Sequence, residues 1–258
     1  MMKKNIYDSS VSILVVTHNH VEFIEKLLDS LKTFGYRNVY ICDASSSDGT
    51  LEILQNSPFS ANLLKKLHLE GFSKNNNDLI RHFNLDTDYF LLLNPDTYFD
   101  TDFLSSLLNR AKEDSGIGII APLVRYPDGR IQVTWKRFPR VSTVIKKRIG
   151  LLKAENEVQM KGPIIDWCLG ACMLISKALL KDGGNLLDER YRLYCEDSDI
   201  CFEANIRGLR VIGYENAYIY HNLNEKSSKN IFSKYNWWNI KSVAKFFLKW
   251  NIKWVFRK

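Results

Sequence analysis

The feature that most constrains this chain is a repeated pairing of a short apolar run with a segment of helical periodicity. The run at residues 11–17 precedes a segment in which Ile24, Leu27, Leu28 and Leu31 recur every three or four residues. Alternating strands and helices form a parallel sheet with helices on both faces. Three further apolar runs follow, at residues 38–43, 89–94 and 116–124. We therefore expect an α/β fold. The stretch from about 125 to 165 is less regular, and we expect an insertion or loop there.

Basic charge is concentrated in the last part of the chain. Residues 226–258 hold nine of the 36 Lys and Arg residues and no Asp or Glu, so the preceding part has 27 basic and 29 acidic residues. With 258 residues and 45% hydrophobic content, the chain can form one sizeable core. The nearly neutral body lacks the basic surface typical of nucleic-acid-binding proteins, so we expect no nucleic-acid partner.

Cysteine usage and hydropathy favour a cytoplasmic protein. The five cysteines are odd in number and form no C-x-x-C pair, which is typical of a reducing compartment. The apolar run near the N-terminus is too short for a signal peptide, and no stretch approaches the length of a membrane-spanning helix.

Polar residues stand where the expected strands end. In open parallel sheets, ligands bind at this edge. A carboxylate at Asp43 can accept hydrogen bonds from a nucleobase or a ribose. Asp96 could hold Mg²⁺ on a diphosphate, because this ion often takes only one or two protein carboxylates. Each motif alone is equally typical of a capped turn. The further candidates for nucleotide binding at strand ends are Thr17, Asn19, Ser45 and Asn94.

A cluster of acids and a histidine lie in the second half. On a helix, Glu196, Asp199 and Glu203 share one face, whereas Asp197 points away from it. Clustered carboxylates raise one another's pKa, which suits a general base, although acids also favour the first turn of any helix. His221 ends a strand-like run, where it could complete a metal site, contact a phosphate or be an ordinary surface residue.

Several motifs occur in a characteristic order between residues 11 and 221. They are VSILVVTHN, CDASSSDGT, GFSKNNN ending at Asn77, LLLNPDT, PDGRIQVTWKRFP, WCLGACMLISKALL and LLDERYRLYCEDSDICFEANIRG. In this order the chain resembles a family 2 glycosyltransferase of the GT-A fold, and more narrowly the rhamnosyltransferase-type members. The resemblance implies an α/β, Rossmann-like, mostly parallel sheet flanked by helices, followed by a C-terminal amphipathic helical tail. It divides the chain into a GT-A domain at 1–225, with a nucleotide-binding half at about 1–100 and an acceptor and catalytic half at about 101–225, and a tail at 226–258.

The resemblance also implies an inverting, metal-dependent glycosyl transfer. Asp43 would contact the base of the nucleotide, with Asn77 beside the donor. Asp96 would hold Mg²⁺ or Mn²⁺ with the help of His221. Asp197, with Glu196 next to it, would be the general base. On the acceptor side the candidates are Trp167, Gly170 and Arg190.

Two departures from the family pattern bear on the site. Asn94 replaces the first acid of the D-x-D metal motif, so metal binding would rest on Asp96 and His221. Arg190 and Arg192 stand close to the acid cluster, where they could bind an anionic acceptor or pair with acids of the 189–196 segment.

The implied donor is dTDP-rhamnose, with UDP-hexoses as alternatives, and the implied acceptor is a lipid-linked saccharide of cell-surface polysaccharide or O-antigen synthesis. A sugar-phosphate nucleotidyltransferase is a second interpretation, but it would show a Gly-rich basic loop after the first strand, which VVTHNHVEF lacks. A non-catalytic membrane-binding or nucleic-acid-binding module is a third.

The basic tail has the pattern of an amphipathic helix. Lysines recur every four residues from Lys241 to Lys253, opposite an aromatic stripe. Such a helix is typical of an anionic membrane interface, so we expect peripheral binding to the inner face of the plasma membrane. The alternative is that the stripe docks on the body. The candidate membrane residues are Trp237, Trp238, Lys241, Lys245, Phe246, Phe247, Lys249, Trp250 and Trp254.

Overall fold

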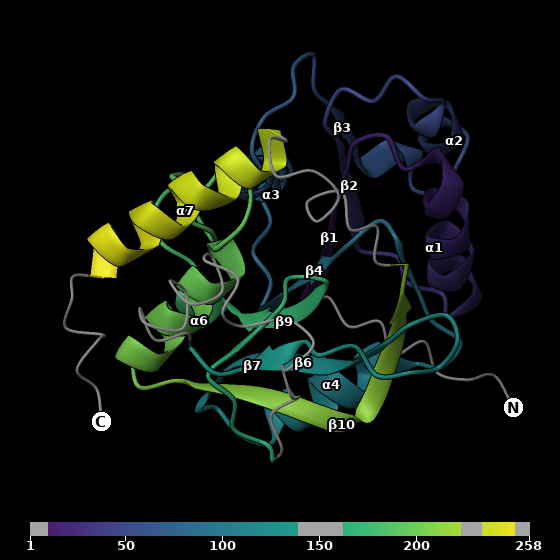
Figure 1. Ribbon diagram of the computed structural model, residues 1–258. Coiled ribbons are helices and arrows are strands. Elements are labelled where there is room, and N and C mark those ends of the chain that lie inside the picture. Colours follow the sequence, from purple (N-terminus) through teal and green to yellow (C-terminus); the bar gives the residue numbers. More distant parts are fainter. Residues whose placement is uncertain (1–9, 139–161, 223–233, 251–258) are drawn as a thin grey trace, which may run out of the picture.

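The computed structural model describes residues 10–138, 162–222 and 234–250, shown in Figure 1 as coloured ribbon. The strands are β1 (Val11–Thr17), β2 (Val39–Asp43), β3 (Leu63–Lys65), β4 (Tyr89–Leu93), β5 (Thr97–Tyr98), β6 (Ile117–Arg125), β7 (Trp135–Lys136), β8 (Trp167–Cys168), β9 (Cys172–Ser176) and β10 (Arg210–His221). The helices are α1 (Val21–Thr33), α2 (Thr50–Gln55), α3 (Phe72–His82), α4 (Phe103–Lys112), α6 (Glu196–Ile206) and α7 (Lys234–Trp250), with short 3₁₀ turns η1 (Ser60–Asn62) and η3 (Lys177–Leu179).

Eight strands form one sheet in the order β3-β2-β1-β4-β9-β6-β10-β5. Strand β9 runs antiparallel to β4 and β6, and β5 runs antiparallel to β10, whereas the other neighbours are parallel. The prediction of an α/β fold with a mostly parallel sheet is confirmed. Strands β7 and β8 pair in a separate small sheet.

The sheet is buried on both faces because its strands are apolar on both sides. In β1, Ile13 and Val15 join the core packed by α1 and α4, whereas Leu14 and Val16 join the core packed by α3 and α6. This alternation follows from the two-residue repeat of a strand. The near-continuous apolar runs in the sequence are therefore those of a parallel sheet covered on both faces.

The antiparallel strand β9 connects the two halves of the chain at the edge where the parallel strands end. Thr17 pairs with Asp43 at the ends of β1 and β2, so both strands stop at the same level. Cys172, the first residue of β9, pairs with Leu93, the last residue of β4. The segment before β9 therefore meets the polar residues that follow β4.

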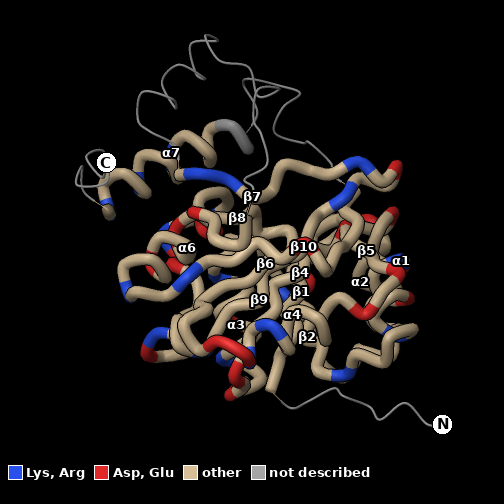
Figure 2. The backbone as a smooth tube through the Cα atoms, turned by 90° about the horizontal axis from the view of Figure 1, so that it is seen from below, with Lys and Arg blue, Asp and Glu red and all other residues tan. Residues whose placement is uncertain are grey.

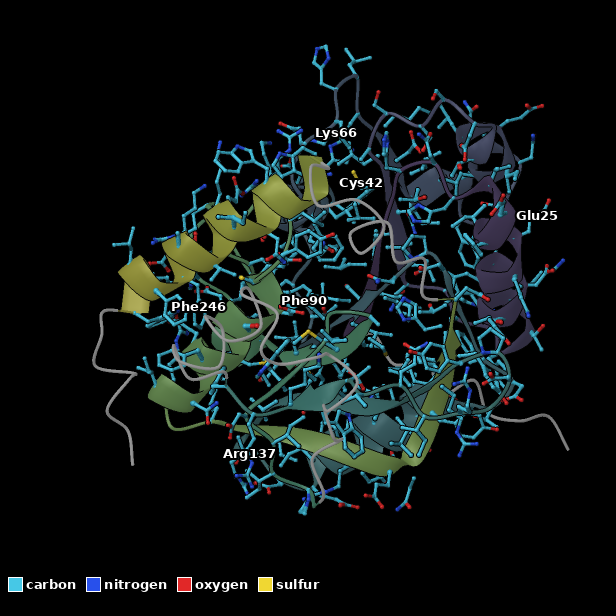
Figure 3. All side chains as sticks on the ribbon, in the orientation of Figure 1. Glu25, Cys42, Lys66, Phe90, Arg137 and Phe246 are labelled. Carbon is cyan, nitrogen blue, oxygen red and sulfur yellow. The ribbon has the colours of Figure 1, made fainter. Side chains whose placement is uncertain are left out.

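Helix α7 packs beside α6 on the second half of the chain (Figure 1). Phe246 is 4% exposed and packs with Tyr191 and Phe202; Figure 3 shows it on the side of α7 that faces the body. Lys249 Nζ lies 2.6 Å from a carboxylate oxygen of Asp199. The expectation that this stripe inserts into a membrane is therefore wrong for Phe246 and Lys249, because both face the protein.

Two further tail residues predicted to face a membrane also contact the body. Trp250 Nε1 donates to Asp199 at 2.8 Å, and Lys245 Nζ donates to the Arg190 carbonyl oxygen at 2.7 Å. The aromatic stripe thus docks on the body, which was the alternative interpretation. Trp254, the last of the predicted membrane residues, lies outside the described residues.

We expect Phe246→Ala to release α7 from the body, because truncating a buried phenylalanine costs about 3–5 kcal/mol. Limited proteolysis should then cut within α7 faster than in the wild type, while the rest of the protein keeps its circular dichroism. Leu248→Ala is the matched control, since Leu248 is on the same helix and 78% exposed. Equal cleavage of both variants and the wild type would contradict this docking.

Candidate active site

Asp43 is the last residue of β2, and its carboxylate is almost fully buried. Asp43 is 1% exposed, and its Oδ2 accepts a hydrogen bond from Ser46 N–H at 3.0 Å. Oδ1 is buried and has no hydrogen-bond partner among the described residues. A buried carboxylate oxygen without a donor is costly, so this atom is suited to accept a hydrogen bond from a ligand.

The loops after β1 and β2 are tied together by the other predicted residues of this edge. Asn19 has a φ of 58°, and its Oδ1 accepts from Ser47 N–H at 2.8 Å. Ser45, with a φ of 63°, donates through Oγ to the Leu67 carbonyl oxygen at 3.3 Å. Thr17 is buried at the end of β1. These side chains therefore shape the loops around Asp43.

Asp96 and His221 are brought together by the antiparallel pairing of β5 with β10. His221 pairs with Thr97, and its Nε2 lies 3.2 Å from Asp96 Oδ1. The two residues are 8% and 5% exposed, respectively. The two residues are 125 positions apart in the sequence, yet both were predicted for the same metal site, and the structure does bring them into contact.

The Asp96 and His221 side chains are suited to a divalent cation. Within residues 10–138, 162–222 and 234–250, no group of three or more His, Cys, Asp or Glu side chains has the geometry of a metal site. Mg²⁺ commonly takes only one or two protein ligands, and phosphate oxygens and water complete its shell. A carboxylate and an imidazole nitrogen at this edge fit that pattern, and also suit Mn²⁺.

Asn77, expected to bind the nucleotide, instead holds a loop of the second half. The residue is 0% exposed. Its Oδ1 accepts from the N–H groups of Leu186 and Leu187, both at 2.9 Å, and its Nδ2 donates to the Leu187 carbonyl oxygen at 2.8 Å. Because its amide is buried and already engaged with this loop, Asn77 has a structural role, and the nucleotide-binding prediction is wrong.

Asp197 lies at the start of α6 and faces the segment before β9. Its Oδ2 accepts from Gly170 N–H at 3.2 Å, and its Oδ1 accepts from Ser198 N–H at 2.7 Å. Ala171, the residue after Gly170, accepts through its carbonyl oxygen a hydrogen bond from Asn94 N–H at 3.0 Å. Gly170 and Ala171 therefore connect Asp197, the predicted base, with the end of β4, which Asp96 follows.

The neighbouring acids Glu196 and Asp197 differ in their hydrogen bonding. Glu196 is 9% exposed, and its Oε2 has no partner among the described residues. Burial, together with the charge of Asp197, raises the pKa of Glu196 to about 8. Burial also raises the pKa of Asp197, but two backbone N–H groups and Lys136 oppose this shift. At neutral pH Glu196 is therefore mostly protonated, and the backbone N–H groups and Lys136 favour the negative charge on Asp197.

Lys136 is a site residue that we did not predict from the sequence. It pairs with Trp167 across the β7–β8 ladder, and its Nζ lies 5.6 Å from the Trp167 ring centroid. Burial lowers the pKa of Lys136, and the charge of Asp197 opposes this shift. The motif PDGRIQVTWKRFP contained the residue, but the irregular pattern gave no strand on which to place it.

The acceptor-side arginine makes a different ion pair from those expected. Arg190 Nε lies 2.9 Å from a carboxylate oxygen of Asp188, whereas Glu189 binds Arg81. The expected pairs of this arginine segment with Glu189 and Glu196 are therefore wrong. Trp167, the second acceptor candidate, is partly exposed and donates through Nε1 to the Arg137 carbonyl oxygen at 3.0 Å.

Comparison with known proteins gives a family match and relatives that align along most of the chain. Residues 12–184 match the model of glycosyl transferase family 2. The rhamnosyltransferase WbbL of Escherichia coli K12 is 25% identical in an alignment of 249 residues that covers 92% of this chain and 92% of the relative. The N-acetylglucosaminyl-diphospho-decaprenol L-rhamnosyltransferase of Mycobacterium tuberculosis is 23% identical over 210 residues, covering 73% of this chain and 68% of the relative.

Solved structures share the fold at lower identity. The mannosyltransferase PcManGT of Pyrobaculum calidifontis, in complex with GDP-Man and Mn²⁺, has a TM-score of 0.61 at 17% identity over 93% of this chain. GalNAc-T7 with UDP, GalNAc and Mn²⁺ has a TM-score of 0.60 at 13% identity over 82% of this chain. This chain covers 63% and 43% of those two chains, respectively.

The family match covers most of the chain, and the GT-A fold and the order of the motifs agree with it. It excludes the interpretations as a nucleotidyltransferase and as a non-catalytic binding module. The chain is a glycosyltransferase, similar to rhamnosyltransferases, and it belongs to glycosyl transferase family 2.

Proposed function

We propose that this protein transfers rhamnose from dTDP-rhamnose to a lipid-linked saccharide during synthesis of a cell-surface polysaccharide such as O-antigen. The observation that carries the proposal is the similarity to two rhamnosyltransferases, one of them along nearly the whole chain. The mycobacterial relative is named for L-rhamnose and for an N-acetylglucosaminyl diphospho-lipid. We extend that acceptor class, a saccharide on a lipid diphosphate, to this chain.

Transfer with inversion requires one displacement and one base on the face opposite the leaving group. Asp197 takes the proton of the acceptor hydroxyl as the oxygen attacks the anomeric carbon of the donor. The N–H groups of Gly170 and Ser198 hold the two carboxylate oxygens in place before the reaction. Lys136 supports the ionised form of Asp197. Glu196 contributes by staying protonated, which leaves the negative charge on Asp197.

The donor nucleotide occupies the edge formed by β1, β2 and β4. Asp43 accepts a hydrogen bond from the base through its free Oδ1, and the Thr17, Asn19, Ser45 and Asn94 segments line the nucleotide. Asp96 and His221 would hold Mg²⁺ or Mn²⁺ beside the nucleotide. A bound divalent ion would neutralise the charge that develops on the nucleoside diphosphate as it leaves.

The acceptor saccharide lies beside Trp167 and Gly170. A Cβ built on Gly170 would stand 3.7 Å from Asp197 Cβ, so glycine leaves space next to the base for the acceptor hydroxyl. The Trp167 ring offers a stacking surface for a sugar, and the cation of Lys136 lies 5.6 Å from its centroid. Arg190, whose side chain is 45% exposed, is available to an anionic group of the acceptor.

We further propose that α7 rests on the inner face of the plasma membrane, through the side opposite to its docked stripe. On that side Trp237 is 58% exposed, Ile240 38% and Leu248 78%. Lys241 is exposed beside them, with its Nζ 5.2 Å from the Trp237 ring centroid. Figure 2 shows blue but no red on the described part of α7. Aromatic, aliphatic and cationic residues together suit an anionic interface.

None of the described helices is both long enough and apolar enough to cross a membrane.

The double variant Trp237→Ala/Leu248→Ala is expected to lower binding to vesicles with an anionic lipid, because it removes the two most exposed apolar side chains of α7. Losing two side chains that the lipid would bury, at about 1.5–3 kcal/mol each, lowers the affinity by at least about 100-fold. Sedimentation with vesicles at moderate salt measures this. The control is the single variant Lys112→Ala, a cation on α4. Unchanged sedimentation of the double variant would refute the membrane-facing side that we assign.

The donor is tested by calorimetry with dTDP, UDP and GDP in the presence of Mn²⁺. We expect dTDP to bind most tightly and to require the metal. Preference for UDP would redirect the donor to a UDP-hexose, and no binding of any of the three by the folded protein would refute the proposed donor site.

A further inference from the structure

A buried glutamine contacts the predicted metal ligand from the side opposite to Asp96. Strand β6 turns back at residues 126–130, where Tyr126 N–H donates to the Arg130 carbonyl oxygen at 2.8 Å. Gln132 N–H then donates to the Val124 carbonyl oxygen at 2.8 Å. The hairpin thus returns Gln132 to the end of the sheet, where it is 4% exposed.

The orientation of the Gln132 amide follows from the backbone next to it. One terminal atom of the amide lies 2.7 Å from the His221 carbonyl oxygen, and the other lies 3.0 Å from His221 Nδ1. The atom near the carbonyl must be the NH₂ group, because two oxygens at 2.7 Å would repel each other. Gln132 Oε1 therefore faces Nδ1, and Nδ1 must carry a proton to donate to it.

A proton on Nδ1 determines which ring nitrogen of His221 has a lone pair available to a metal ion. In the neutral ring the other nitrogen, Nε2, then has a lone pair. Nε2 lies 3.2 Å from Asp96 Oδ1, so two acceptors face each other in a nearly buried place. Two facing acceptors need a cation between them: either a second proton on the ring, which Nε2 then donates to Asp96, or a divalent ion that both can bind.

We propose that Gln132 is a positioning residue that holds His221 as the Nδ1–H tautomer, so that Nε2 and Asp96 together present a ready pair of metal ligands. The inference rests on the proposed metal site at Asp96 and His221. Histidines that bind metals in proteins generally donate their second ring N–H to a fixed acceptor, which sets the tautomer and the orientation of the ring. Here a side-chain amide supplies that acceptor, and its own orientation is fixed by the backbone of the histidine that it serves.

The test combines the tautomer of His221 with the affinity for Mn²⁺, in the wild type, Gln132→Leu and Gln132→Glu. Two-bond ¹H–¹⁵N spectra of metal-free, histidine-labelled protein report which ring nitrogen carries the proton, and His221→Gln identifies its signals. Calorimetry with Mn²⁺ and dTDP reports the affinity. Circular dichroism shows that each variant is folded.

We expect the wild type to show the Nδ1–H form. In Gln132→Leu the acceptor is gone, so the proton moves to Nε2, where Asp96 accepts it, and Mn²⁺ binds about 10–100-fold more weakly. Gln132→Glu keeps an acceptor opposite Nδ1 and should retain the tautomer, but it replaces the NH₂ group with an oxygen that the His221 carbonyl repels, so it should lose part of the affinity.

A folded Gln132→Leu variant with wild-type Mn²⁺ affinity would overturn the proposal. So would a leucine variant that binds Mn²⁺ weakly but keeps the Nδ1–H form, because Gln132 would then act only through local packing. Failure of the proposed metal site is a separate result: the wild type would bind no Mn²⁺ with any nucleoside diphosphate, whatever its tautomer.

Discussion

Asp197→Asn is expected to lower kcat by about 10²–10⁴-fold, which is the usual contribution of a general base. The amide keeps the size of the side chain and can accept through its one oxygen from the N–H group of either Gly170 or Ser198, but it cannot take a proton. Donor binding should therefore stay unchanged by calorimetry. Because burial raises the pKa of Asp197, the wild-type rate should also fall as the pH drops through this raised pKa, where the base becomes protonated.

Glu196→Gln is the matched control for the assignment of the base. The pKa of Glu196 is raised to about 8, so at pH 7 the side chain is neutral and glutamine imitates it. We expect a loss of less than about tenfold, well below the effect of removing a base. If Glu196→Gln proves far more damaging than Asp197→Asn, the roles of the two acids are reversed.

Asp96→Asn is expected to weaken Mn²⁺-dependent binding of dTDP by about 100-fold, or ~3 kcal/mol. Asparagine leaves the backbone bond from Asn222 N–H to the residue 96 carbonyl oxygen in place, but it removes the charge that a divalent ion needs. With Mn²⁺ replaced by a chelator, the variant and the wild type should bind dTDP equally weakly.

Asp100→Asn is the control for Asp96→Asn, because Asp100 is an exposed acid four residues further along the same segment. It should bind dTDP and Mn²⁺ as the wild type does. A metal-dependent affinity that survives Asp96→Asn would show that the ion is held elsewhere or is not required.

The parts of the fold that depend on periodicity could be predicted from the sequence. The strand ends at Asp43 and Asn94 follow from apolar runs that stop at polar residues, and in a parallel sheet such ends share one edge. The contact of His221 with Asp96 was not visible in periodicity, because it depends on the antiparallel pairing of β5 with β10. The sequence offered each residue separately as a possible metal ligand, and only the resemblance to a family placed the two in one site.

Asn77 and Gln132 show why a motif in the sequence does not by itself give the role of a polar residue. Both are buried amides in recognisable motifs. Asn77 accepts hydrogen bonds from the backbone N–H groups of Leu186 and Leu187. Gln132 instead forms a hydrogen bond with a site residue, His221. The difference lies in which distant segment packs against each amide, and residues more than 80 positions apart leave no local signal of that packing.

The tail illustrates a limit of the helical wheel. A wheel predicts which residues share a face, and Phe246 and Trp250 do both contact Phe202. It does not say whether that face meets lipid or protein. Asp199 decides the question, since its buried carboxylate binds both Lys249 and Trp250, and that partner lies on α6, a separate helix.

The most direct test of the proposed activity is a transfer reaction. The full chain is incubated with dTDP-rhamnose, Mn²⁺ and an N-acetylglucosaminyl diphospho-lipid, and the molecular mass of the lipid product is measured by mass spectrometry. We predict the gain of one deoxyhexose with release of dTDP, at a rate about 10²–10⁴-fold lower in Asp197→Asn. An active preparation that transfers sugar only from another nucleotide, or that works equally well without Asp197, would contradict the account.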